Sequence, residues 1–131
     1  MGYSFSCDPP SDHARHGCAF NDWQMTYVRL VMVEAGAING DGLKAPDLPG
    51  FEVEDRTLPA KLFLSNDGWR ISAEDAGFIA ARLRAAVAAG VVGQLLSFFD
   101  DAPPTAEVRE WVEEFATFNE SAAARDGYYV T

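Results

Sequence analysis

Four side chains that could hold a metal ion lie close together near the start of this 131-residue sequence. Both cysteines and both histidines fall within twelve positions, as Cys7, His13, His16 and Cys18. Imidazole and thiolate are the ligands that tetrahedral zinc prefers, so one interpretation is a small zinc-binding domain. The spacing C-x5-H-x2-H-x-C matches no common zinc-finger pattern. It therefore favours a solvated loop with two incidental thiols, and a Cys7–Cys18 disulfide is the third alternative.

A second candidate site is the acidic stretch toward the C-terminal end. Residues 101–131 contain seven acidic residues and two arginines, which gives this stretch a net charge of -5. That value is half of the total net charge of -10. Such a surface attracts a basic protein surface and speeds the encounter with it, although charge runs also serve as solubilising faces. Asp67 lies in a predicted turn that could present it to a partner. The candidate partner-binding residues are Glu107, Glu110, Glu113, Glu114 and Asp67.

Composition and motifs narrow the classes of function. Twenty acidic against ten basic residues repel phosphates and anionic lipids, so we expect no nucleic-acid or membrane binding. No secretory signal begins the sequence, which makes the cytoplasm the expected location. The sequence has no phosphate-binding glycine loop, nucleophile elbow or H-E-x-x-H helix. The favoured interpretation is a non-catalytic acidic interaction module (an inhibitor, an immunity-type protein or an adaptor), and a small enzyme or ligand-binding domain is a further alternative.

Signals for helix ends predict the helices that must position these residues. Asn21 is a good N-cap, and Gln24 can complete a capping box at the start of a helix. Ser72 caps a second helix, which Gly90 ends. A short buried helix follows, and a long helix with an apolar stripe begins at an N-cap at Thr105.

The strand signals are shorter. Two apolar-rich runs flank Asn66-Asp67-Gly68, a pattern typical of a β-hairpin. Residues 37–60 read as an extended loop with a brief edge strand at 51–53. The predicted strands are Gly2–Ser6, Lys61–Ser65, Trp69–Ser72 and Tyr128–Val130. We therefore expect one α+β domain over residues 1–131, with a small, mostly antiparallel sheet of three to four short strands packed against three to four helices. The first and last strands are candidates for neighbours in that sheet.

The second half of the sequence resembles a pattern that recurs in small bacterial proteins of unknown function. In those proteins a Ser-Asn-Asp-Gly-Trp hairpin precedes a Ser- or Thr-capped helix. A late helix bearing Trp, Phe and Asn then leads into a terminal Gly-Gly-Tyr or Gly-Gly-Phe strand. The matching segments here are Ser65–Trp69, Ser72–Asp75, Trp111–Asn119 and Gly127–Val130, with Asp126 where the first Gly often stands. This resemblance implies no activity, cofactor or partner, and the Cys/His loop has no counterpart in it.

Overall fold

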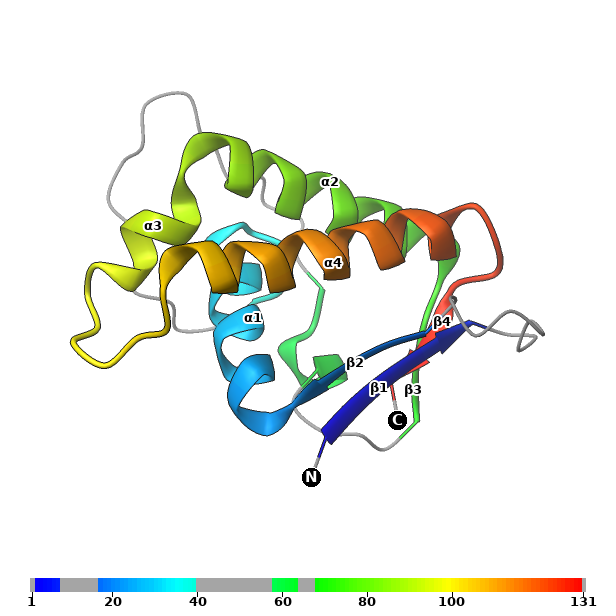
Figure 1. Ribbon diagram of the computed structural model, residues 1–131. Coiled ribbons are helices and arrows are strands. Elements are labelled where there is room, and N and C mark those ends of the chain that lie inside the picture. The colour runs from blue at the N-terminus through cyan, green and yellow to red at the C-terminus, as the bar shows by residue number, and fades with distance from the viewer. Residues whose placement is uncertain (1, 8–16, 40–57, 64–67, 131) are drawn as a thin grey trace.

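The fold is a four-stranded antiparallel sheet with helices packed on one side of it (Figure 1). The computed structural model describes residues 2–7, 17–39, 58–63 and 68–130. The strands are β1 (Gly2–Cys7), β2 (Gly17–Asn21), β3 (Trp69–Ile71) and β4 (Tyr128–Val130), in the spatial order β2-β1-β4-β3. The predicted α+β class is confirmed.

The centre of the sheet joins the two ends of the chain. Phe5 on β1 lies opposite Cys18 on β2 and opposite Val130 on β4. The prediction that the first and last strands are neighbours in the sheet is therefore confirmed. Their inward side chains, Phe5 and Val130 among them, belong to the core.

The first two helices begin at the N-caps that the sequence predicts. Helix α1 (Asp22–Glu34) starts at a complete capping box, in which Asn21 Oδ1 accepts from the Gln24 backbone N–H at 2.8 Å and Gln24 Oε1 accepts from the Asn21 N–H at 3.0 Å. Helix α2 (Ala73–Ala89) starts at Ser72, whose Oγ accepts from the backbone N–H of Asp75. It ends at Gly90, whose φ of +81° suits glycine.

Helices α3 (Val91–Leu96) and α4 (Thr105–Ala123) complete the helical layer. The prediction that Thr105 caps α4 is wrong by one position, because Pro104 occupies the cap and Thr105 is already helical. Pro104 has a φ of -54°, which leads into the helix without a side-chain cap. The apolar stripe predicted for α4 is buried at Val108, Val112, Phe115, Phe118 and Ala122, whereas its remaining member, Trp111, is only half-buried.

A buried polar contact fixes α4 against β4. Tyr128 Oη donates to Asn119 Oδ1 at 2.7 Å, and Asn119 Nδ2 donates to the Phe115 carbonyl at 2.8 Å. All three residues are fully buried. Because buried polar groups are costly unless they are paired, this arrangement specifies how the strand sits on the helix.

One predicted strand and the predicted hairpin need correction. The Lys61–Ser65 strand is wrong where the structure describes it, since Ala60–Phe63 form a 3-10 helix (η1) that buries Phe63. A short apolar run cannot distinguish a strand from one helical turn. The described partner of β3 is β4, so the predicted hairpin is wrong as well. Residues 17–19, predicted as loop, belong to β2, while the predicted strand at 51–53 lies outside the described residues.

Candidate interaction surface

Four aromatic side chains form a continuous cluster between α1 and α4, here named the aromatic patch. The Trp23 ring lies edge-to-face against Tyr27 and Trp111, with centroids 5.8 Å and 5.6 Å away. Tyr27 makes the same kind of contact with Phe99, at 6.3 Å. Each such pair contributes about 0.5–1.5 kcal/mol beyond its buried area. The patch is therefore an organised surface rather than a set of independent side chains.

Three secondary-structure elements position the patch. Trp23 and Tyr27 are one turn apart on α1, whose start is fixed by the capping box. Phe99 lies just after α3, where its N–H donates to the Leu96 carbonyl, and Trp111 lies in the first half of α4. Figure 1 shows these segments on the side of the molecule away from β3 and β4.

The patch retains much exposed apolar surface. Trp23 is 53% exposed, Phe98 52% and Phe99 36%, and these are the large hydrophobic residues that are exposed in the described part of the chain. Trp23 and Phe99 both contact Tyr27, so these two exposed rings belong to one surface. Exposed apolar residues that gather in this way are typical of interaction sites.

Carboxylates border the patch along α4. Glu107 and Glu114 lie one turn before and after Trp111, and Glu110 lies on the same flank. All three are exposed, and no Lys or Arg among the described residues forms an ion pair with them. We name Glu107, Glu110 and Glu114 the acidic flank.

The fourth predicted glutamate of α4 faces elsewhere. Glu113 acts on Arg84 of α2, where it adds to an increase in the arginine pKa caused mainly by the hydrogen bond from Arg84 to Glu120. Arg84 Nη2 lies 2.9 Å from Glu120 Oε1 and 2.8 Å from Thr117 Oγ1, and the pairing lowers the pKa of Glu120. This side of α4 thus carries paired charge, whereas the acidic flank does not within the described residues.

Further carboxylates come from the neighbouring elements. Asp22 directly precedes Trp23, and Asp100 and Asp101 directly follow Phe99. All three residues are exposed. Exposed acidic residues are therefore sequence neighbours of Trp23 on α1 and of Phe99 in the α3–α4 connection.

The predicted zinc ligands are only partly described. Cys18 belongs to the core, where burial and, to a smaller extent, Glu114 raise its pKa to about 12. A cysteine binds zinc as a thiolate, and burial of Cys18 disfavours that charged form. Cys7 ends β1, and His13 and His16 lie outside the described residues. Within the described ranges no three potential ligands come together to hold a metal ion.

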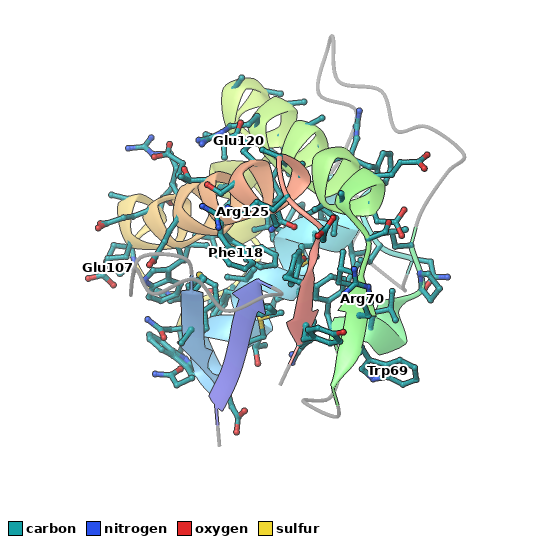
Figure 2. The ribbon with its side chains drawn as sticks, turned by 90° about the vertical axis from the view of Figure 1, so that its right-hand side faces the viewer. Trp69, Arg70, Glu107, Phe118, Glu120 and Arg125 are labelled. Atoms are coloured by element: carbon teal, nitrogen blue, oxygen red, sulfur yellow. The ribbon has the colours of Figure 1, made fainter. Side chains whose placement is uncertain are left out.

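The remaining predicted binding element lies on another side of the molecule. Asp67 falls outside the described residues, and Trp69, two positions later, is half-buried. Arg70 places its guanidinium 5.3 Å from the centre of the Tyr129 ring and donates to the Asp126 carbonyl. Figure 2 shows Trp69 and Arg70 on the opposite side of the view from Glu107.

Sequence reasoning missed the aromatic patch as a site. The rings of the patch come from α1, α4 and the segment after α3, and no local signal in the sequence shows how these elements pack together. Comparisons with protein-family models, curated proteins and solved structures find no match to this chain. None of the helices in the described ranges has the length and apolar character needed to cross a membrane.

Proposed function

We propose that the protein is a cytoplasmic, non-catalytic interaction module, of the inhibitor, immunity-type or adaptor kind, whose acidic flank binds a basic surface of another protein. The observation that carries this proposal is the alignment of Glu107, Glu110 and Glu114 on one exposed flank of α4 without a counter-ion among the described residues. The same reasoning makes nucleic-acid phosphates poor ligands for the surface.

Rigidity of α4 makes its charges effective together. The helix is held by its buried apolar stripe and by the contact between Asn119 and Tyr128. At 1.5 Å per residue, Glu107 and Glu114 are about 10 Å apart along the helix axis. This separation is close to the Debye length of about 10 Å at 0.1 M salt, so an approaching cation experiences their combined field. Binding should therefore be fast and sensitive to salt.

A pair of charge-matched variants tests the proposal. Glu107→Gln/Glu110→Gln/Glu114→Gln removes the acidic flank. Glu74→Gln/Glu120→Gln/Asp126→Asn removes the same net charge from other parts of the described surface. Each immobilised protein is exposed to native lysate at low ionic strength, and the retained proteins are quantified by mass spectrometry.

We expect the wild-type protein and the control variant to retain the same basic proteins, which salt then elutes. The acidic-flank variant should retain them at least about tenfold less, because steering by charge changes association rates by 10-fold to 1000-fold. Equal retention by the two variants would mean that net charge alone causes the binding and would refute the proposal. Retention of no basic protein by the wild type would refute it too.

A further inference from the structure

We propose that the aromatic patch and the acidic flank together bind an amphipathic, arginine-bearing segment of the basic partner. This inference rests on the proposed function for its charge and adds the chemistry of the partner. It follows from the contact of the exposed Trp23 ring with Trp111, which lies one helical turn from Glu107 and Glu114 of the acidic flank.

The aromatic patch supplies the apolar part of the contact. Trp23 and Phe99 are both linked through Tyr27 by edge-to-face contacts, which restrict their rotation before any partner arrives. Binding then costs little side-chain entropy. Aromatic side chains of this kind are the residues that most often dominate the affinity of an interface. Apolar residues of the partner segment therefore dock on these rings.

Arginine matches the rest of the surface better than lysine does. Its planar guanidinium stacks on aromatic rings and donates to carboxylates in a bidentate manner. An aromatic ring and carboxylates occur together here, since Glu107 and Glu114 lie one turn before and after Trp111 on α4. The chain uses the same chemistry internally, where Arg70 lies 5.3 Å from the centre of the Tyr129 ring.

A second copy of this chain is a poorer occupant. A symmetric dimer through the patch places the same surface on both sides of the interface. The acidic flank of one copy, with Asp100 and Asp101, would then lie close to that of the other. Like charges that face each other in an interface disfavour association, and no Lys or Arg of the described surface pairs with the acidic flank.

The three tryptophans of the chain provide a direct experiment. The probe is a synthetic peptide of about 18 residues, long enough to form a helix, with Leu along one face and Arg on the other. It is titrated into 15N-labelled full-length protein, and the three indole N–H signals are assigned by single Trp→Phe variants. Trp23 and Trp111 belong to the aromatic patch, whereas Trp69 lies elsewhere and serves as an internal control.

We expect the indole signals of Trp23 and Trp111 to shift and that of Trp69 to stay in place. Trp23→Ala should weaken peptide binding by about 30-fold, the loss that defines a dominant interface residue. Trp69→Ala should leave binding unchanged. A peptide with Lys in place of each Arg should bind several-fold more weakly, and a peptide with Glu in those positions should not bind.

The other outcomes separate this inference from the proposed function. If the acidic-flank variant loses the peptide while Trp23→Ala and Phe99→Ala retain it, the acidic flank binds without the rings and this inference is wrong. If the wild-type protein does not bind the Arg peptide but still captures basic proteins through its acidic flank, the inference fails alone. Self-association in sedimentation that Trp23→Ala abolishes would identify a second copy as the occupant and overturn the proposal.

Discussion

Gly127 holds the junction between α4 and β4 in a position that tolerates no side chain. Its φ is +85°, and a Cβ there would overlap the Ile71 carbonyl oxygen and crowd the start of α2 at Ala73. Gly90 is the matched control, because its φ of +81° is nearly the same and a Cβ there would meet nothing within 4 Å. Replacing each glycine with alanine therefore separates the cost of conformation from the cost of close approach.

The expected magnitudes follow from these two environments. Both Gly→Ala variants carry the cost of a non-glycine residue at positive φ, about 1–2 kcal/mol. Gly127→Ala must in addition push the backbone of β3 away from β4, and such overpacking typically costs about 1–3 kcal/mol. Gly127→Ala should thus lose about 2–5 kcal/mol of unfolding free energy in total, and about 1–3 kcal/mol more than Gly90→Ala.

Urea denaturation followed by circular dichroism measures both values. For a domain of this size each kcal/mol also lowers Tm by about 3–5 °C, so calorimetry provides a second measurement. If the two variants lose the same stability, the close approach of Gly127 to Ile71 does not constrain the fold and the reasoning is refuted.

Two further predictions concern the core. Tyr128→Phe leaves the buried Asn119 Oδ1 without its donor and should lower the unfolding free energy by about 1–3 kcal/mol. The control Tyr27→Phe, at a half-buried site, should change the unfolding free energy by less than about 0.5 kcal/mol. Equal losses in urea denaturation would contradict the buried contact. The pKa of Cys18 is raised from about 9 to about 12 chiefly by burial, so the unfolded chain loses this proton first and stability should fall as pH rises from 9 toward 12. Cys18→Ala should remove that alkaline loss, and an unchanged pH slope of the unfolding free energy would count against the burial.

The helices were predictable because their signals are local. The capping box at Asn21, the Ser72 cap and the Gly90 stop each depend on residues within one turn of one another. Burial of the α4 stripe likewise follows from its period. These local signals do not depend on contacts with distant segments, so tertiary packing did not change the predicted helices.

The sheet and the surface depend on contacts between distant segments. Residues 61–63 form a helical turn because burial of Phe63 is satisfied there without strand pairing. Strand β2 is short and contains Gly17 and Ala19, which are poor strand formers, although the alternation of Cys18 and Phe20 was a usable signal. The exposure of Trp23 could not be predicted, because it is decided by how α1 packs against α4.

The pairing of β1 with β4 also determines the order in which the molecule can be assembled. Phe5 must pair with Val130, near the other end of the sequence. Closing the loop between these two residues costs about 4 kcal/mol of chain entropy before any contact compensates for it. Packing of α2 on α4 beforehand shortens the effective loop, so the helices should form before the sheet. Until residues 128–130 leave the ribosome, β1 and β3 lack the strand that lies between them. A nascent or truncated chain without β4 therefore exposes two strand edges, which makes it prone to aggregation.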